Sequence, residues 1–464
     1  MPSITPIESI GQIESIESIT SMHIETRHVT NWGRYPDLLA EVASPADTDE
    51  TRAYLHSRER LIARGNGRCY GDAALSPHIV STLKMNRLRS FDPHTGVADC
   101  EAGLLLSDLL DTVVPLGWFP HVTPGTRFVS IGGCIASDVH GKNHPAKGCF
   151  SNWLISFELM RSDGSVLTCS RTENPNLFWH TCGGMGWTGI VLSARFQLMR
   201  LSSGQMRQTT RRGKNLAEVF QILEENRGAT YAAAWLDAAA FSEKKLGRGV
   251  VFLAEHDEVS QLPRPERLGM KLPGNSTIQK FMSLVKVASP LSTGEGPGVR
   301  LLNEFYFLKN RPNEQLVGLY PYFYPLDRWL DWNLLYGPRG LVQYQFCLPE
   351  KTSREGMAQV LDIVRRSPET PYLAVLKRHA DPPSEAIRSF PMRGYSLALD
   401  FRRSPTLPRL VEQLDDLVWQ LGGRIYLAKD AGSAARMGRV QPDVESDEGK
   451  FWSLLRGRVE VGKF

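Results

Sequence analysis

The sequence has no paired cysteine motif and no long apolar run. Its seven cysteines are scattered without a C-x-x-C, so neither a disulfide framework nor a zinc ribbon is predicted, and a reducing compartment is expected. No window approaches the ~18 consecutive apolar residues of a membrane helix. The first residues lack the basic start and apolar run of a secretory signal. We therefore expect a cytoplasmic protein and leave open a peripheral contact with the inner membrane, its periplasmic face included.

The charges and the missing motifs exclude further classes of protein. The 54 Lys and Arg against 50 Asp and Glu leave a net charge of +4 without basic blocks, so no nucleic-acid partner is expected. Neither G-x-S-x-G nor G-x-x-x-x-G-K-[ST] occurs, so nothing supports a hydrolase nucleophile elbow or a P-loop. With 464 residues, of which 42% are apolar and 22% charged, the chain is predicted to be globular, with a core that needs no metal or disulfide.

Four segments are predicted along the chain. Residues 1–24 repeat Ile-Glu-Ser-Ile and are expected to form a disordered tail. Residues 25–201 contain short β-like runs punctuated by glycine, and residues 202–423 alternate strands with helices, which predicts two α+β domains, the second built on a sheet. Residues 424–464 are too short to fold alone and are expected to return to the first domain. Helical spacing in the second domain occurs at 214–226, 353–366 and 407–421.

Three glycine-rich loops follow one another in the first domain. The loop at 63–73 follows a predicted strand, and glycines this dense let backbone N–H groups approach an anion such as a diphosphate. A tight surface turn is the alternative. In the second segment, Pro124-Gly125-Thr126-Arg127 is followed at 130–141 by small residues, which suit a helix start whose free N–H groups face a phosphate. A close-packed helix crossing is the alternative there.

The third loop, at 182–190, formally contains G-x-G-x-x-G. A helical segment precedes it and a strand follows it, whereas a Rossmann dinucleotide site needs strand, loop and helix in that order, so no Rossmann site is predicted. His140 and His144 have H-x-x-x-H spacing, but no third ligand stands at a fixed spacing, so no metal site is expected. Three glycine loops in one domain indicate instead one extended cofactor held mainly by backbone amides.

The order of these motifs resembles the vanillyl-alcohol-oxidase-type flavoproteins, which have a PCMH-type FAD-binding domain. The matching strings are R-G-N-G-R-C-Y-G-D at 64–72, P-G-T-R at 124–127, D-V-H-G-K-N-H at 138–144 and G-G-M-G-W-T-G-I at 183–190. Within that family the chain looks most like the polyprenyl-phosphoryl-ribose 2′-oxidases, with further landmarks at 234–237, 325–327, 332–333, 343–346 and 426–430. The resemblance runs from about Trp32 to Lys429 or beyond. It implies an α+β fold of two domains, one binding FAD and one built on a sheet that binds substrate.

The resemblance implies FAD as the cofactor, and Arg68 bears on how the FAD is attached. Relatives that bind FAD covalently often carry a histidine in the first loop, as R-G-x-G-H-S. Arg68 occupies that position here, so non-covalent FAD is expected. The implied FAD contacts are Ala63, Arg64, Gly65, Asn66, Gly67, Arg68, Cys69, Tyr70, Gly71, Asp72, Ala73, Gly125, Ser130, Ile131, Gly132, Gly133, Ser137, Asp138, Val139, His140, Ile190 and Tyr426.

Catalytic and substrate-binding residues are implied in the same way. Lys429, in Y-L-A-K-D, is the leading candidate to orient the substrate or to offset negative charge on the reduced flavin, and Tyr70 and His140 are the other catalytic candidates. Lys377 is expected to meet a substrate phosphate. The implied substrate-binding residues are Trp235, Phe323, Tyr324, Gln343, Gln345, Lys377, Ser396 and Lys429. Core packing is the alternative for Trp235, Phe323 and Tyr324.

The implied reaction is oxidation of the 2′-hydroxyl of a polyprenyl-phosphoryl-β-D-ribose to the 2′-keto sugar. This is the first half of an epimerisation to the arabinose donor for arabinan and cell-envelope glycan synthesis. An NAD(P)H-dependent keto-sugar reductase would be the partner, and a quinone is a candidate electron acceptor. Ser396 and Ala398 stand where members of that branch have an amide and a thiol, which leaves the sugar and lipid preference open.

Other expectations remain beside this one. A lipid-linked substrate predicts a peripheral membrane encounter, for which the loop at 256–298 is a candidate. The rival functions are a soluble alditol or sugar-lactone oxidase that produces hydrogen peroxide, and a non-catalytic flavin-binding partner of a reductase.

Overall fold

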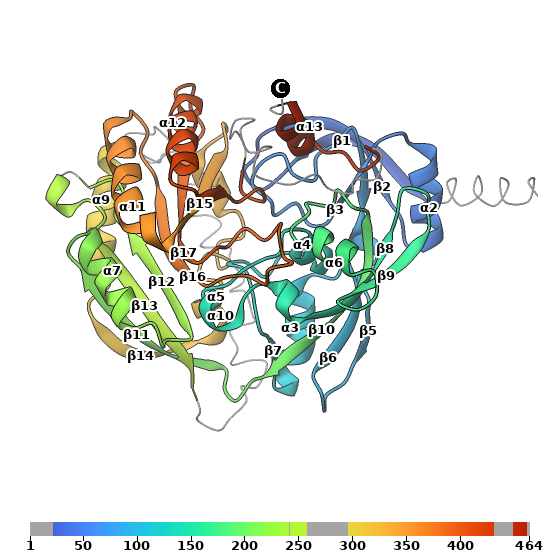
Figure 1. The fold of residues 1–464 in the computed structure, drawn as a ribbon, viewed down its shortest axis with the longest axis horizontal. Coiled ribbons are helices and arrows are strands. Elements are labelled where there is room, and N and C mark those ends of the chain that lie inside the picture. The colour runs from blue at the N-terminus through green and yellow to red at the C-terminus, as the bar shows by residue number, and fades with distance from the viewer. Residues whose placement is uncertain (1–21, 241, 258–295, 431–448, 462–464) are drawn as a thin grey trace, which may run out of the picture.

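The computed structural model describes residues 22–240, 242–257, 296–430 and 449–461, whose strands form three sheets (Figure 1). Residues 1–21 of the expected tail lie outside the described residues. The boundary expected at residue 24 is wrong, because His23 and Ile24 pair with Ser44 and Ala43 at the start of the first strand, β1 (His23–Thr30).

A four-stranded sheet in the order β1-β2-β4-β3 begins the chain. The pair β1 and β2 is antiparallel, whereas β4 runs parallel to both β2 and β3. The other strands of this sheet are β2 (Asp37–Ser44), β3 (Ile62–Arg64) and β4 (His78–Ser81). The helix α2 (Thr48–Ser57) and the 3-10 turn η1 (Thr82–Lys84) belong to the same part of the chain. The helix α2 starts at Asp47, whose side chain accepts from the N–H groups of Asp49 and Glu50. The first glycine loop begins where β3 ends.

The second sheet has the order β5-β6-β10-β8-β9, and β7 also pairs with β10. Its strands are β5 (Leu88–Phe91), β6 (Val97–Glu101), β7 (Trp118–Pro120), β8 (Leu154–Met160), β9 (Val166–Ser170) and β10 (Ile190–Arg200). The helical elements among them are α3 (Leu106–Val113), η2 (Val114–Leu116), α4 (Ile131–Ala136), α5 (His144–Lys147), η3 (Phe150–Trp153) and α6 (Pro175–Thr181). The third glycine loop lies between α6 and β10, so the expected order of helix, loop and strand is confirmed.

The third sheet has eight strands in the order β14-β11-β13-β12-β16-β17-β15-β18. These strands are β11 (Gln205–Gly213), β12 (Tyr231–Leu236), β13 (Gly249–His256), β14 (Asn313–Gly318), β15 (Leu341–Pro349), β16 (Leu373–His379), β17 (Gly394–Arg402) and β18 (Arg424–Ile425). The helical elements are α7 (Leu216–Glu225), η4 (Glu243–Lys245), α9 (Gly296–Lys309), α10 (Leu319–Phe323), η6 (Trp332–Tyr336), α11 (Glu350–Arg366) and α12 (Leu407–Gln420). The helices expected at 214–226, 353–366 and 407–421 are thus confirmed as α7, α11 and α12.

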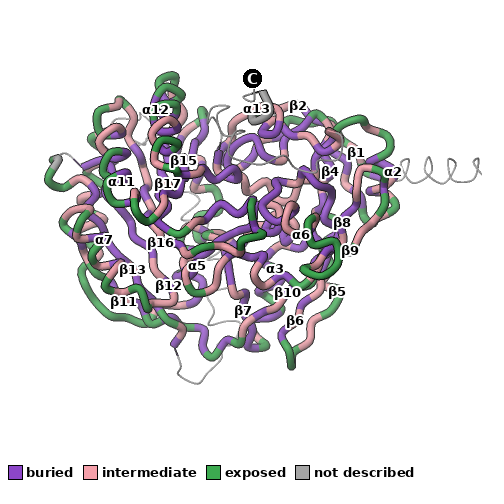
Figure 2. The backbone as a smooth tube through the Cα atoms, in the orientation of Figure 1, coloured by how far each residue is buried: buried purple, intermediate pink, exposed green. Residues whose placement is uncertain are grey.

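Side chains of the eight-stranded sheet alternate between two different faces, as successive residues of a strand must. On the helix-covered face, Phe346, Leu376 and Leu397 form one buried cluster with Phe220 of α7 and Leu414 of α12. Figure 2 shows central strands such as β15 and β17 largely buried, the strand β11 near the edge of the sheet partly exposed, and the outer sides of the helices exposed. The other face, which we call the polar face, turns toward the first domain.

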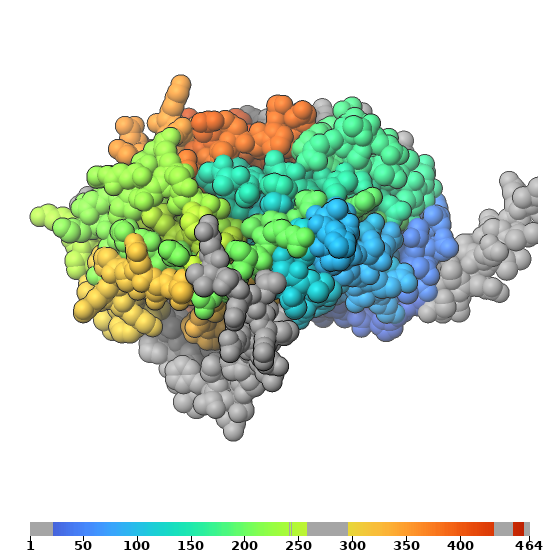
Figure 3. All heavy atoms as spheres, turned by 90° about the horizontal axis from the view of Figure 1, so that it is seen from below, coloured from blue at the N-terminus to red at the C-terminus, as the bar shows by residue number. Residues whose placement is uncertain are grey.

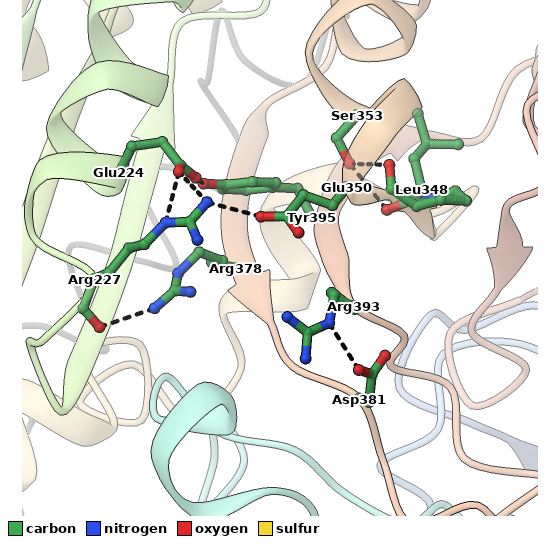
Figure 4. Close-up of polar contacts among 10 residues, drawn as sticks. Glu224, Arg227, Leu348, Glu350, Ser353, Arg378, Asp381, Arg393 and Tyr395 are labelled. Atoms are coloured by element: carbon green, nitrogen blue, oxygen red, sulfur yellow. Dashed lines mark hydrogen bonds and ion pairs between the residues drawn. The ribbon is translucent and has the colours of Figure 1, made fainter.

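Polar contacts at the start of β17 attach two of these helices to the sheet (Figure 4). The hydroxyl of Tyr395 donates to Glu224 at the end of α7. Arg227 contacts Glu224 and also Glu350 at the start of α11, the latter at 2.7 Å. Arg378 on β16 donates to the carbonyl of Arg227 at 2.9 Å. These bonds hold the helix-covered face in one arrangement, which in turn fixes the position of the polar face.

The C-terminal segment packs against the first sheet. Phe451 pairs in parallel with Leu61, and α13 (Leu454–Val461) carries Arg458, which donates to the carboxylates of Asp72 and Asp430 at 2.9 to 3.0 Å. This contact brings the residues after β18 beside the first glycine loop.

Two expectations about composition can be compared with the structure. All seven cysteines are free thiols, six of them buried. Among the described helices, none combines the length and the apolar character needed to cross a bilayer.

Candidate active site

The first glycine loop is held from two sides by backbone hydrogen bonds. The N–H groups of Trp32 and Gly33 donate to the carbonyls of Cys69 and Tyr70 at 2.8 and 3.0 Å. The N–H of Tyr70 donates to the carbonyl of Ala428 at 3.0 Å. The loop is therefore placed between the end of β1 and the segment that carries Lys429.

The charged side chains of this loop have different roles. Arg64 donates to a backbone carbonyl at 2.8 Å, and Asp72 accepts two bonds from Arg458. The guanidinium carbon of Arg68 lies 4.1 Å from the ring centroid of Trp32, which is close enough for a cation–π contact. Its Nε is buried and has no hydrogen-bond partner in the described part of the chain. Arg68 is thus the charged group of the loop that a ligand can engage.

The second glycine segment forms α4, and one expectation about it is wrong. A helix starts after Ser130, as expected, and the Oγ of Ser130 caps it by accepting from the N–H of Gly133 at 3.2 Å. The N–H groups of Ile131 and Gly132, however, donate to carbonyls of the segment 102–104 at 2.9 and 2.8 Å. These amides are not free to face a phosphate, because α4 packs directly on that segment.

Asp138 follows α4 and is an internal anchor. Its carboxylate accepts from the N–H and the hydroxyl of Ser151 at 2.9 and 3.0 Å, and also from the hydroxyl of Ser389, 251 residues further along the chain. Burial raises the pKa of Asp138, and these donors oppose the shift. The carboxylate ties the segment before His140 to the loop after β16.

We expect the substitution Asp138→Ala to lower the free energy of unfolding by about 3 kcal/mol, because it leaves three buried donors without an acceptor. The matched control is Asp163→Ala, since Asp163 is exposed and accepts from Ser165 next to it in sequence. Urea denaturation of both variants measures the difference. Equal stability of the two variants would contradict the anchoring role.

The polar face of the large sheet gathers the predicted substrate residues. Directly paired residues of neighbouring strands share a face, and Gln343 pairs with Asp400, while Lys377 pairs with Ser396. Gln345 pairs with Ala398, which pairs in turn with Val375, and Val375 pairs with Trp235. The face thus carries Trp235, Gln343, Gln345, Lys377, Ser396 and Asp400.

Lys429 lies at the centre of the site, between the first loop and the polar face. Its Nζ is 3.7 Å from the ring centroid of Tyr70, a residue of the first loop. Burial lowers the pKa of Lys429 to about 8, and the charge of Asp400 acts in the opposite direction. Burial likewise raises the pKa of Asp400 to about 6, although the amide of Gln343 donates to its carboxylate. The two form a buried pair of opposite charge near neutral pH.

His140 is buried beside the same face and is neutral. Its Nε2 lies 3.2 Å from Nε2 of Gln345, so the amide donates and the imidazole accepts. Burial lowers the pKa of His140 well below its ordinary value, and the charge of Lys377 contributes. Its ring also lies 5.1 Å from that of Tyr426, whose hydroxyl donates to the carbonyl of Ser137 at 3.0 Å. The polar face, the segment after α4 and the segment after β18 therefore meet at His140.

Two further lysines, both half-buried, flank this position. Burial lowers the pKa of Lys377 to about 8 and that of Lys142 to about 7, the latter also under the charge of Lys377. Lys142 donates to the carbonyl of Tyr322, and its Nζ lies 4.3 Å from the centroid of that ring. The site is therefore rich in buried ammonium groups, which suits an anionic substrate.

The three predicted aromatic wall residues divide into two groups. Phe323 packs 5.0 Å from the ring of Phe119, and the hydroxyl of Tyr324 bonds to that of Thr123 at 2.6 Å. Both belong to the main apolar cluster around the second sheet, so the alternative of core packing describes them. Trp235 shares the polar face, and its ring lies 4.7 Å from that of Tyr306 on α9.

The remaining predicted FAD contacts border a second apolar cluster. Ala73, Ile190 and Tyr426 belong to it, and Ala63 and Cys69 pack against it. The cluster thus joins residues of the first loop, the start of β10 and the end of β18. Gly125 lies apart from it, and a Cβ built there would have nothing within 4 Å.

Sequence reasoning missed Asp400 and His379 as site residues. Asp400 accepts from Gln343 and, at 3.3 Å, from the hydroxyl of Tyr336. His379 lies 2.7 Å from the hydroxyl of Ser396 through its Nε2. Strand alternation could have found both, because Asp400 stands four residues from Ser396 on β17 and His379 stands two residues from Lys377 on β16.

Three buried imidazoles lie in contact here. The ring of His379 is 5.2 Å from that of His140 and 4.8 Å from that of His144. Even so, in the described ranges no three or more His, Cys, Asp or Glu side chains are placed to hold a metal ion. The two histidines of the H-x-x-x-H pattern do not lie on one helix, since α5 begins at His144 with Pro145 in its first turn.

Comparison with known proteins gives the class of this site. Residues 36–170 match the pattern of an FAD binding domain. The chain is 32% identical over 430 residues to decaprenylphosphoryl-beta-D-ribose oxidase from Mycolicibacterium smegmatis, which covers 90% of this chain and 92% of that protein. It is 28% identical over 192 residues to xylooligosaccharide oxidase from Thermothelomyces thermophilus, 38% of each chain. It is 27% identical over 175 residues to L-gulonolactone oxidase from Mus musculus, 36% of this chain and 39% of that protein.

These matches define an FAD-dependent oxidoreductase that acts on alcohol groups. The chain belongs to the family of FAD-binding, PCMH-type oxidases, and the mixed α/β architecture with a large antiparallel sheet agrees with the fold of that family.

The described residues fit a bound dinucleotide at the first loop. In the part of the chain that the structure describes, the N–H groups of Asn66, Gly67 and Arg68 donate to no backbone carbonyl. Gly67 has φ of +61°, a conformation that glycine adopts without strain. Together with the buried Nε of Arg68, these amides offer donors for a diphosphate.

Proposed function

We propose that this protein oxidises the 2′-hydroxyl of a polyprenyl-phosphoryl-β-D-ribose to the 2′-keto sugar with FAD as cofactor. The observation that supports it most is the extent of the similarity to the ribose oxidase, which covers 92% of that relative. The matches to xylooligosaccharide oxidase and L-gulonolactone oxidase cover only 38% and 39% of those proteins. The ribose oxidase thus matches this chain over its substrate-binding part as well.

FAD is proposed to bind without a covalent bond, with its diphosphate on the amides of 66–68 and on Arg68. The segment α4 would then form a wall of the site rather than a phosphate cradle, because the amides of Ile131, Gly132 and Gly133 are occupied. Tyr426 and His140 would line the end of the site beside the polar face. When bound, FAD takes up the hydride that leaves the alcohol carbon.

The protein's own groups are proposed to orient the alcohol and manage its proton. Lys429 lies over the ring of Tyr70 and is influenced by the charge of Asp400, and its pKa of about 8 lets it hold or release a proton near neutral pH. The pKa of Tyr70 is raised by burial, so its hydroxyl acts as a hydrogen-bond donor. His140, neutral and held by Gln345, would be a further hydrogen-bonding group for the sugar.

The phosphate is proposed to lie beside Lys377. Its ammonium is buried on the polar face, and Lys142 adds a second positive group in the same region. A phosphodiester carries a negative charge, which would give these two positive groups a partner. A quinone is proposed as the final acceptor of the two electrons taken from the sugar. The keto sugar would then pass to an NAD(P)H-dependent reductase, which would supply the two electrons that complete the epimerisation to the arabinose donor.

The form of FAD attachment gives a direct prediction. Acid precipitation of the purified yellow protein should leave the colour in the supernatant, because Arg68 offers no side chain that bonds covalently to flavin. Visible absorption of pellet and supernatant measures this. Yellow colour retained in the washed pellet would contradict non-covalent binding.

A comparison of electron acceptors and substrates tests the reaction. Polyprenyl-phosphoryl ribose should be oxidised with a quinone analogue as acceptor, and free alditols and sugar lactones should not. Rapid turnover of a free polyol with matching release of hydrogen peroxide would instead identify a sugar oxidase. Absence of turnover with every pentosyl substrate would favour a flavin-binding subunit without catalysis of its own.

A further inference from the structure

Helix α9 has an apolar stripe on its outer side. Its inner side is fixed to the sheet by Val299, by Asn303, which donates to Asp237 at 3.0 Å, and by Tyr306, which packs on Trp235. The outer side carries Leu301, Phe305 and Leu308, which are 70%, 61% and 57% exposed, with Leu302 beside them at 49%.

This pattern is the reverse of an ordinary surface helix, whose outward side is polar. Positions 301, 305 and 308 follow one another at the spacing of a single helical face, so the exposed side chains form one stripe. In Figure 3 the helix, in yellow, lies at the surface of the face seen from below. A contiguous apolar stripe of this kind marks a contact surface rather than scattered exposed residues.

The charges around the stripe are positive. Lys309 ends the helix and Arg311 follows it, and both are exposed. Glu304 is the only acidic residue of α9, and it is paired with Arg248 at 2.5 Å and Lys245 at 3.5 Å. Among the described residues, neither Lys309 nor Arg311 forms an ion pair. Exposed leucines and a phenylalanine bordered by such cations are the composition of a helix that lies in the interface of an anionic membrane.

We propose that this outer face of α9 is a docking surface for an anionic lipid bilayer. A second copy of the chain is a poorer occupant, because the same face of a second α9 offers Lys309 and Arg311 no free carboxylate: Glu304 is already paired with Arg248 and Lys245. The proposal rests on the proposed function for its purpose, since a lipid-linked sugar must be taken from a bilayer.

The inner side of α9 connects the docking surface to the site. Tyr306 contacts Trp235, and Trp235 lies on the polar face with Lys377. A bilayer held against the outer side would therefore lie one helix away from a wall of the candidate substrate site. Most of the loop expected to make the membrane contact, residues 258–295, lies outside the described residues, and α9 follows it directly.

Flotation with phospholipid vesicles tests the proposal. The full-length protein should float with vesicles that contain phosphatidylglycerol and only weakly with vesicles of phosphatidylcholine alone. The variant Leu301→Ser/Phe305→Ser/Leu308→Ser should lose about tenfold or more of its partition coefficient. Lys309→Glu/Arg311→Glu should remove the preference for phosphatidylglycerol. The control Leu39→Ser/Leu116→Ser, which changes leucines 57% and 50% exposed elsewhere, should float like the unchanged protein.

The outcomes separate this inference from the proposed function. A detergent-soluble, short-chain polyprenyl-phosphoryl ribose should reduce the flavin equally fast in the unchanged protein and in the α9 triple variant, whereas a long-chain substrate in vesicles should react more slowly with the variant. Vesicle binding without any sugar oxidation would leave the docking surface standing and remove the function. Equal flotation of the triple variant and the unchanged protein would overturn the docking surface. It would also be overturned if sedimentation showed the unchanged protein as a dimer and the triple variant as a monomer.

Discussion

Replacing Lys429 by alanine is expected to slow reduction of the flavin by substrate about 10²- to 10³-fold, because a preorganised group at the reacting oxygen is removed. The variant should keep its fold and its FAD, since Lys429 donates its backbone N–H to Tyr426 whatever its side chain. Loss of the ammonium also leaves Asp400 without the positive charge that opposes the rise of its pKa. Asp400 would then be protonated at higher pH than in the unchanged protein.

Anaerobic stopped-flow measurement of flavin absorbance gives the rate directly. The control is Lys351→Ala, which removes an exposed lysine at the start of α11. FAD content and the melting temperature of both variants show whether any loss is structural. An unchanged rate of reduction in the Lys429→Ala variant would contradict the role that we propose for this lysine.

Replacing Lys377 by glutamine is expected to raise the KM for a phosphorylated substrate by about 100-fold, because it removes one partner of a buried charge pair. The rate at saturating substrate should change much less, since this contact is proposed to bind the phosphate rather than the reacting carbon. The effect should disappear for a ribose derivative without phosphate. An equal loss for both substrates would contradict the phosphate contact.

The same lysine predicts a pH dependence with a definite sign. Burial lowers the pKa of Lys377 to about 8, so its ammonium is present below that pH and is lost as the pH rises through it. The ratio kcat/KM should therefore fall above about pH 8. Lys429 has a similar pKa, and the variant Lys377→Arg separates the two, because arginine stays charged throughout this range. A profile of Lys377→Arg identical to that of the unchanged protein would assign the fall to Lys429.

Local patterns in the sequence predicted the parts of the site that depend on short spacing. The helix start after Ser130, the order of helix, loop and strand around the third glycine loop and the helices α7, α11 and α12 all follow from neighbouring residues. Gln343 and Gln345 were implied by the family resemblance, and alternation along β15 puts both on one face. Pairing of β17 with β15 and β16 places the side chains of Lys377 and Ser396 on the same face.

Contacts between distant segments were beyond such reasoning. The amides of Ile131 and Gly132 looked free because the carbonyls that accept from them belong to the segment 102–104. Asp138 looked like a cofactor contact, yet its carboxylate is occupied by Ser151 and by Ser389, 251 residues away. Asp72 is likewise held by Arg458. In each case a polar group beside the expected cofactor is used by the fold itself, and only its partner in space reveals this.

The central claim is that the polar face presents a polyprenyl-phosphoryl ribose to a bound flavin. Anaerobic mixing of the purified holoprotein with polyprenyl-phosphoryl-β-D-ribose measures it most directly, with the visible absorbance of the flavin as the signal. We expect the absorbance to bleach, and the 2′-keto sugar to form in an amount equal to the flavin reduced. A flavin that stays oxidised with this substrate, or that is bleached only by a free alditol, would contradict the account.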